Sequence, residues 1–173
     1  MKKDQNLQEL YINELRDAFS AESQILKALP KVIEAVTCQK LTASLQKHLE
    51  ATETHLEIVA EIVKRHGEKP TGEFCEGMEG LLKEADSMIG EFPAGALLDA
   101  ALISACQKVE HYEIATYGTL RVFAATLGHP EDAARLTMLL EEEVEADLKL
   151  TELAMGAINQ DAAMNAEPEK VRK

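Results

Sequence analysis

The sequence predicts an all-α protein, a four-helix bundle with one long crossover that carries a short fifth helix. Hydrophobic residues make up 46% of the 173 residues but aromatic residues only 4%, with no Trp and few Gly or Pro. This composition favours helices over strands. Apolar residues also recur every three or four positions through four long stretches, as on the buried face of a helix. At this length we expect one domain with a substantial core.

The first helix is predicted over residues 7–36. Pro30 lies inside it and should either kink the helix or end it and start another. The apolar face contains one acid, Glu22, whose central position favours a buried carboxylate over one that reaches water from the edge of the face. This face consists of Tyr11, Leu15, Ala18, Glu22, Ile25, Leu29, Ile33 and Val36.

The second helix is predicted from the tight connection at 37–40 to about His66. The short connection implies an antiparallel pair, which brings Thr52 level with Glu22. His48 and His55 flank Thr52 on one side, and Glu53 lies on the other. The sequence leaves open which of His48, His55 and Glu53 is the ligand that the second helix contributes. The predicted inner face consists of Leu41, Leu45, Leu49, Thr52, Leu56, Val59 and Val63.

A break at 67–72, rich in Gly and Pro, separates the two halves of the chain. A short amphipathic helix is predicted over 75–89, and we interpret this segment as the long crossover.

The third and fourth long helices are predicted over 94–127 and 131–159, joined by a Gly-His-Pro turn. The inner face of the third carries Glu110 and Glu113, whereas His111 should point outward because it lies about 100° and 160° around the helix from them. The fourth carries Glu143 and Asp147, one turn apart and level with the first two acids. Two hairpins joined by a long crossover have ferritin-like connectivity. The bundle is expected over 1–160, followed by a polar, frayed tail over 161–173.

These acids predict a metal centre, because several carboxylates cannot all be charged in a dry core without a cation. Ferritin-like dinuclear sites combine inward Glu residues with two Glu-x-x-His motifs. Here those motifs are altered to Thr52-x-x-His55 and Glu143-x-x-Ala146. The predicted ligands are Glu22, His55, Glu110, Glu113, Glu143 and Asp147, with His48 as the second nitrogen candidate.

Such an oxygen-rich set suits Fe, Mn, Mg or Ca better than Zn or Cu, and we expect one or two Fe or Mn ions. The alternatives are a polar network with shared protons and a surface position for His55. Tyr117, one turn beyond Glu113, could donate to the site or act as a redox-sensitive phenol, but core packing is the favoured interpretation.

Several segments carry a family resemblance: Asp17 with Ser20 to Gln24, His48 to Thr52, 100–103, Gln107 to Gly118, Leu140 to Glu143, and Asp147 to Thr151. Through them the chain resembles, over nearly its whole length, the YciE/YciF group of ferritin-like bacterial stress-induced proteins. The resemblance implies a ferritin-like bundle, usually dimeric, with a metal centre and induction under stress. It implies no particular activity.

Charge and composition limit the function classes. A net charge of −13 argues against nucleic-acid binding. No apolar run is long enough for a membrane span or a signal region, so a cytoplasmic location is expected. The scattered cysteines, Cys38, Cys75 and Cys106, are expected to be reduced and structural.

Two functions are compatible with these features. The first is an iron- or manganese-binding, stress-associated homodimer with ferroxidase or peroxide-removing activity, whose small oxidant would be dioxygen or peroxide. The second is a non-catalytic structural or interaction protein that uses the bundle for dimerisation.

Overall fold

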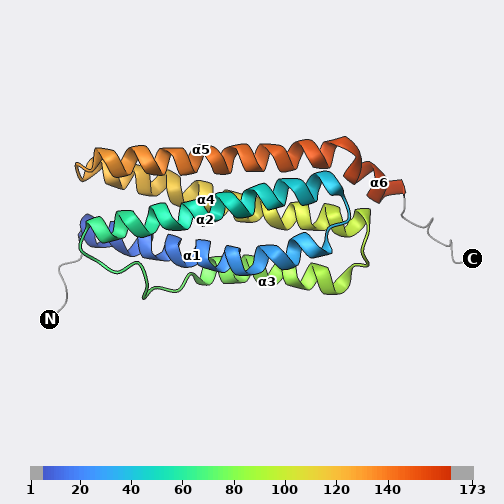
Figure 1. Ribbon diagram of the computed structural model, residues 1–173, viewed down its shortest axis with the longest axis horizontal. Helices are drawn as coiled ribbons and strands as arrows, with labels where there is room; N and C mark the ends of the chain where they lie inside the picture. The colour runs from blue at the N-terminus through green and yellow to red at the C-terminus, as the bar shows by residue number, and fades with distance from the viewer. Residues whose placement is uncertain (1–5, 165–173) are drawn as a thin grey trace, which may run out of the picture.

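The computed structural model describes residues 6–164, and this part of the chain is entirely helical apart from its connections. The long helices run along the long axis of the molecule, and a shorter helix lies beside α1 (Figure 1). The elements are α1 (Leu7–Ala35), α2 (Gln39–Arg65), α3 (Glu76–Glu91), α4 (Ala96–Thr126), α5 (Pro130–Leu153), a π-helical turn η1 (Ala154–Ile158) and α6 (Asn159–Met164). The predicted all-α bundle, with its long crossover and short fifth helix, is confirmed.

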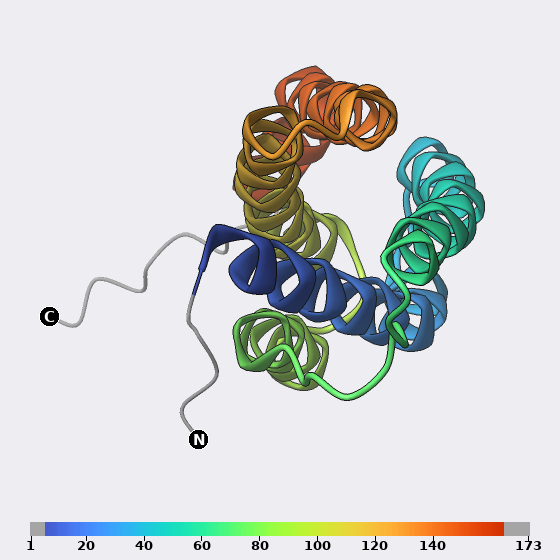
Figure 2. The same cartoon turned by 90° about the vertical axis from the view of Figure 1, so that its left-hand side faces the viewer.

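The helices pair as the connection lengths predict. α1 packs on α2 and α4 packs on α5, while α3 of the crossover packs against both α1 and α4. Figure 2 shows α3 beside α1, with α2 and α5 on either side of one flank of the bundle. A groove of about 850 Å³ follows this flank and is lined by residues of both helices, including His48 and Glu142.

Capping side chains, a glycine and a proline mark several of the helix ends. The Asn6 side chain accepts a hydrogen bond from the backbone N–H of Glu9 at 2.9 Å and caps α1. Cys75 caps α3 by accepting from the backbone N–H of Met78 at 3.4 Å. Gly128, with φ of 81°, closes α4, and Pro130 occupies the first turn of α5.

α1 continues through Pro30 to Ala35, so the predicted alternative of a helix that ends at Pro30 and restarts is wrong. The helix tolerates the missing N–H and the ring at an exposed position. No break interrupts α1, α2, α4 or α5 within these bounds.

The end of the bundle differs from the sequence prediction. Ala157 lies seven residues after the buried Leu150 and would share its face in a regular α-helix, but Ala157 is exposed and Ile158 is buried instead. The cause is η1, because a π-helical turn adds a residue and shifts the buried face by one position. The helical structure also reaches Met164, beyond the predicted helix end at Asn159, whereas most of the predicted tail lies outside the described residues.

α2 is rotated slightly from its predicted face. Leu49 and Leu56 are only half-buried, whereas His55 and Ile62 are fully buried. Glu53 is exposed. The rotation therefore turns the histidine side of α2, and not its acidic side, toward the centre of the bundle.

Two apolar clusters fill the bundle, one toward each end. One combines Ile25 and Leu29 with Leu41, Leu45 and Leu102. The other combines Leu15, Val59 and Ile62 with Leu120 and Leu136. Near the boundary between them lie Glu22, His55, Glu110, Glu113 and Glu143, whereas the buried Asp99 and Asp132 lie in the first turns of α4 and α5.

The three cysteines are free, as expected, with Cys75 buried and Cys38 and Cys106 half-buried. Within residues 6–164, no helix has the length and apolar character needed to cross a membrane.

Candidate metal centre

Each long helix contributes to a layer of ionisable side chains in the middle of the bundle. Glu22 comes from α1, His55 from α2, Glu110 and Glu113 from α4, and Glu143 from α5, and all five are at most 3% exposed. Helical geometry explains the grouping, because Glu110 and Glu113 are three residues apart and so lie on one face. The four helices therefore present their acids and histidine to one another at the same level.

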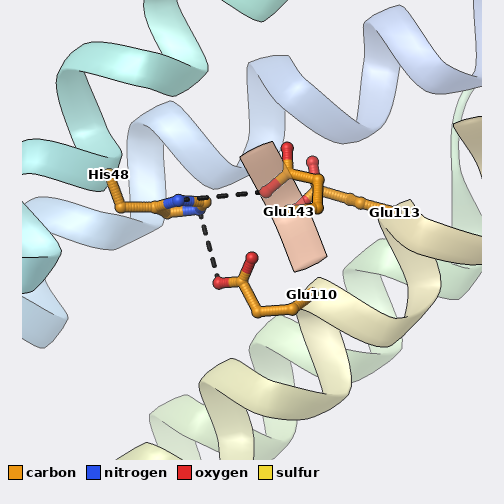
Figure 3. Close-up of side chains that lie close together, drawn as sticks. All are labelled: His48, Glu110, Glu113 and Glu143. Carbon is orange, nitrogen blue, oxygen red and sulfur yellow. Dashed lines mark ion pairs between the residues drawn. The ribbon is translucent and has the colours of Figure 1, made fainter. Parts of the chain in front are cut away.

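The side chains form two overlapping groups that share Glu143. One comprises His48, Glu110, Glu113 and Glu143; the other comprises Glu22, His55 and Glu143. In each group the candidate ligand atoms all lie within 4.8 Å of one another. Figure 3 shows the first group, with His48 from α2 directed toward both Glu110 and Glu143.

The separations around His55 lie in the range expected for ligands of one metal ion, whereas those of His48 start from different ring nitrogens. A ligand bond of about 2.1 Å places neighbouring ligands of one ion about 3.0 Å apart and opposite ligands about 4.2 Å apart. His55 Nδ1 lies 2.8 Å from Glu143 Oε1 and 3.9 Å from Glu22 Oε1. His48 Nε2 lies 3.5 Å from Glu110 Oε1, and its Nδ1 lies 4.0 Å from Glu143 Oε2.

The layer leaves many buried polar atoms without a hydrogen-bond partner. Within the described residues, all but one of the buried side-chain N and O atoms that lack a partner belong to these two groups, the exception being Arg16 Nε. They are Glu22 Oε2, His48 Nε2, His55 Nδ1, Glu110 Oε2, Glu113 Oε2 and both Glu143 oxygens. Of these, His55 Nδ1 and Glu143 Oε1 lie 2.8 Å apart and pair with each other when the imidazole is protonated. Buried polar atoms are normally hydrogen-bonded, so this concentration is what either a bound cation or protons shared between the carboxylates would satisfy.

The pKa values show how the layer behaves without a cation. Burial, followed by the charges of neighbouring carboxylates, raises the pKa of Glu110 and Glu113 well above the usual range. Burial and the charge of Glu143 raise the pKa of Glu22 to about 7. The acids of α1 and α4 therefore tend to hold protons when no cation is present.

Glu143 and His55 behave as an ion pair inside this layer. Burial opposes the charge of Glu143, but contact with His55 and the charge of His48 outweigh it and lower the carboxyl pKa. Burial also opposes protonation of His55, yet contact with Glu143 and the charges of Glu143 and Glu22 raise the imidazole pKa to about 9. For His48, burial is the largest influence and lowers the pKa.

Neighbouring side chains orient the candidate ligands. His55 directs Nδ1 into the layer while its Nε2 lies 2.7 Å from Glu142 Oε2. Metal-binding histidines commonly use a carboxylate in this way to fix the ring. The Tyr117 hydroxyl donates to Glu22 Oε1. Core packing alone, the favoured interpretation from sequence, is therefore incomplete for Tyr117.

The structure brings together most of the predicted ligands but places Asp147 at the edge. Asp147 accepts a hydrogen bond from Gln107 Nε2 at 3.0 Å and lies 3.4 Å from His111 Nε2. It belongs to neither group of candidate ligand atoms. His111 points outward, as predicted, with a side chain that is 68% exposed.

On α2, His48 and His55 face the layer, whereas Glu53 is exposed. Thr52, at the position of the usual glutamate, is buried and donates its hydroxyl to the backbone carbonyl of His48 at 2.9 Å. Glu142 was missed as a partner of His55, because its position on α5 is 50% exposed and carries no apolar pattern.

The first group is reachable from outside, whereas the second is enclosed. The His48 side chain is 11% exposed, and His48 and Glu110 line the groove between α2 and α5. Small polar molecules could therefore contact the Glu110 side of the layer without unfolding of the bundle.

The fold and the layer together define an all-α bundle protein with a buried carboxylate–histidine centre. Residues 6–163 match the family described as domain of unknown function DUF892. The chain therefore belongs to this family.

Named relatives agree with this assignment. The chain is 40% identical to Protein YciF of Escherichia coli K12 over 161 residues, covering 92% of this chain and 97% of that protein. The crystal structure of YciF, described as an E. coli stress protein, superposes with a TM-score of 0.85 and covers 92% of this chain and 99% of the other. The resemblance that the sequence predicted is confirmed.

A second solved structure, YcfI from Rhodopseudomonas palustris, is 44% identical, with a TM-score of 0.83. It covers 87% of this chain and 97% of the other, and is provisionally described as a structural protein.

Proposed function

We propose that the buried layer binds one or two Fe or Mn ions and that the chain is a ferritin-like, stress-associated metal protein. The observation that carries this proposal is the concentration of unpartnered buried atoms on Glu22, His48, His55, Glu110, Glu113 and Glu143. A cation would supply the partner that each of these atoms lacks.

The donor set favours Fe or Mn over other metals. Four carboxylates with two imidazoles are too rich in nitrogen for a typical Ca²⁺ or Mg²⁺ site, and without cysteine they do not resemble a structural zinc site. Two divalent cations would also neutralise the four carboxylates of Glu22, Glu110, Glu113 and Glu143, and the shared Glu143 lies where it could contact both.

The groove at the Glu110 side favours reactivity toward small molecules. A metal with an open position can bind oxygen species, so we propose ferroxidase or peroxide removal as the activity. The homodimer and the cytoplasmic location remain predictions from the sequence.

Metal analysis of protein purified without chelators tests the site directly. We expect one to two equivalents of Fe or Mn, and the Glu113→Gln variant should retain much less because it removes a charge without changing size. Glu141→Gln on the exposed face of α5 is the matched control and should retain the wild-type amount. Wild-type protein that keeps no metal after dialysis would contradict the proposal.

Anaerobic Fe(II) titration followed by air or peroxide tests the activity separately. We expect an absorbance change from oxidised iron that is lost in Glu113→Gln. If the protein retains iron but does not oxidise it, the chain is a metal-binding protein without ferroxidase or peroxidase activity.

The second candidate is a structural protein that associates through its surface. It is favoured by the description of YcfI and by Val144, Leu148 and Met155, which are at least 40% exposed and follow one face from α5 into η1. Light scattering of the Leu148→Glu variant tests it. Dissociation of an oligomer with unchanged metal content would assign this face to association and leave the metal proposal intact.

A further inference from the structure

A second feature adjoins the layer: a small apolar cavity between α1, α2, α3 and α4. Its volume is about 30 Å³ and its walls include Ile25, Leu29, Leu45, Ala85 and Ala105. At one end it reaches His48 and Glu110. The cavity therefore ends on two of the candidate metal ligands.

Size limits what this cavity can hold. One water-sized molecule needs about 10–15 Å³, whereas a cavity that binds benzene measures about 150 Å³. A volume of about 30 Å³ accommodates a diatomic molecule and excludes organic substrates.

Most of the lining is unfavourable for water, and only the end at His48 and Glu110 offers polar partners. A buried water needs two to four polar partners, and apolar cavities of proteins stay dry and bind apolar molecules such as xenon. Here polar side chains stand only at one end of an otherwise almost wholly apolar wall. A small uncharged gas loses little on leaving water for such a site.

We infer that this cavity is a binding site for a small apolar diatomic gas, specifically dioxygen, held beside His48 and Glu110. His48 and Glu110 line both this cavity and the groove between α2 and α5. The same pair is thus approached by an apolar reactant from the apolar cavity and by polar reactants from the groove. The use of the gas rests on the proposed function, whereas its binding does not.

Xenon is the probe for the binding step, because it reports occupancy without any reaction. Crystals of the wild-type protein pressurised with xenon should show xenon against Ile25, Leu45 and Ala105. The inference is overturned if xenon is absent from this position or if the cavity holds an ordered water bonded to Glu110.

Variants that fill the cavity test whether the gas binds there. Ala105→Val adds two methyl groups at the α4 wall and should abolish xenon binding. Ala124→Val is the matched control, because Ala124 is also buried on α4 but lies in the other apolar cluster. Ala85→Val fills the cavity from α3 if Ala105→Val does not fold.

Oxidation of Fe(II)-loaded protein by two oxidants then separates the routes. With dioxygen, Ala105→Val should slow oxidation several-fold relative to Ala124→Val. With peroxide, which is polar and enters from the groove, the two variants should react equally fast. Equal slowing with both oxidants would contradict the inference. If the protein binds no iron, the proposed function fails, but the xenon result still decides the cavity.

Discussion

Glu143 is the residue on which the electrostatics of the layer depend. Its carboxylate is shared by both groups of candidate ligands, and its lowered pKa contrasts with the raised pKa values of Glu110 and Glu113. Without a cation, the negative charge of the layer therefore concentrates on Glu143 and the protons on the acids of α4. Metal binding must displace these protons, so metal affinity should rise with pH.

Tyr117→Phe should destabilise the protein by about 1–3 kcal/mol, since it removes the hydroxyl that donates to the buried Glu22 carboxylate. Thermal unfolding measures the loss. In the Glu22→Gln background the same substitution should cost less, because the charged acceptor is already gone. An equal cost in both backgrounds would show that the hydroxyl acts through packing alone.

For single residues, the sequence predicts which side chains lie on the buried face of a helix but not which side chains they contact. Periodicity predicted the burial of Glu22, Glu110, Glu113 and Glu143, which the structure confirms. It could not separate Asp147 from them, since Asp147 shares their face but is held at the edge by Gln107. It ranked His55 ahead of His48, whereas the packing of α2 against α5 brings both into the layer.

Among the helices, α1 is continuous although it contains Pro30. Proline in a helix interior costs about 3 kcal/mol relative to alanine. Replacing proline by alanine also makes the unfolded chain more flexible, which lowers the unfolding free energy by about 0.4–1 kcal/mol.

Pro30→Ala should therefore stabilise the protein by about 2 kcal/mol and raise the midpoint of thermal unfolding. Lys27→Ala, at another exposed position of α1, is the control and should change stability by less than about 0.5 kcal/mol. A lower midpoint for Pro30→Ala would mean that the bundle requires a bend that proline supports.

The α1–α2 connection is anchored to α4 by Asp99, which is 2% exposed. Its carboxylate accepts from Thr37 N at 2.9 Å, Thr37 Oγ1 at 2.7 Å and Cys38 N at 3.0 Å. It thereby ties the first hairpin to the second at one end of the bundle.

Asp99→Ala should cost about 2–4 kcal/mol in unfolding free energy, because it leaves several donors unpaired. Asp86→Ala removes an acid from an exposed ion pair with Lys31 and should cost less than about 1 kcal/mol. Chemical denaturation of both variants measures the difference. Similar losses would show that Asp99 is not an anchor.

The order of the elements follows from the sequence because long periodic stretches and Gly–Pro breaks are local features. Asp99 and η1 do not follow in this way. The Asp99 carboxylate acquires its role only when α4 meets the α1–α2 connection, and η1 occurs in the segment AMGAI, which carries no turn residues except Gly156.

Across the whole molecule, a layer of ionisable groups separates two apolar clusters. These clusters stabilise the bundle, whereas the layer destabilises it whenever its carboxylates are charged and unpaired. The layer therefore lowers the stability of the bundle unless its carboxylates bind protons or a cation. Natural proteins retain such centres mostly where function requires them.

The stability of the metal-free protein should accordingly fall as the pH rises from about 5 to 8. Glu22 has a pKa of about 7 in the folded chain against 4.5 as its ordinary value, and the pKa values of Glu110 and Glu113 are raised further. In this range the folded state binds more protons than the unfolded state, so the unfolding free energy decreases with pH. For Glu22 alone the shift corresponds to about 3 kcal/mol.

His55 acts in the same direction, because its stabilisation is complete below pH 6.5 and is lost through a pKa of about 9. Glu143, with its lowered pKa, acts in the opposite direction, but its stabilisation is lost only when the pH falls below its ordinary value of 4.5.

Calorimetry in chelator at about pH 5 and pH 8, repeated with Mn²⁺, measures the effect. We expect a lower unfolding midpoint at pH 8 in chelator, and Mn²⁺ should remove most of the difference because the cation stabilises the charged carboxylates. Glu113→Gln cannot titrate at that position, so its metal-free stability should depend less on pH. A metal-free wild type that becomes more stable between pH 5 and 8 would mean that these carboxylates are paired by groups other than a cation or shared protons.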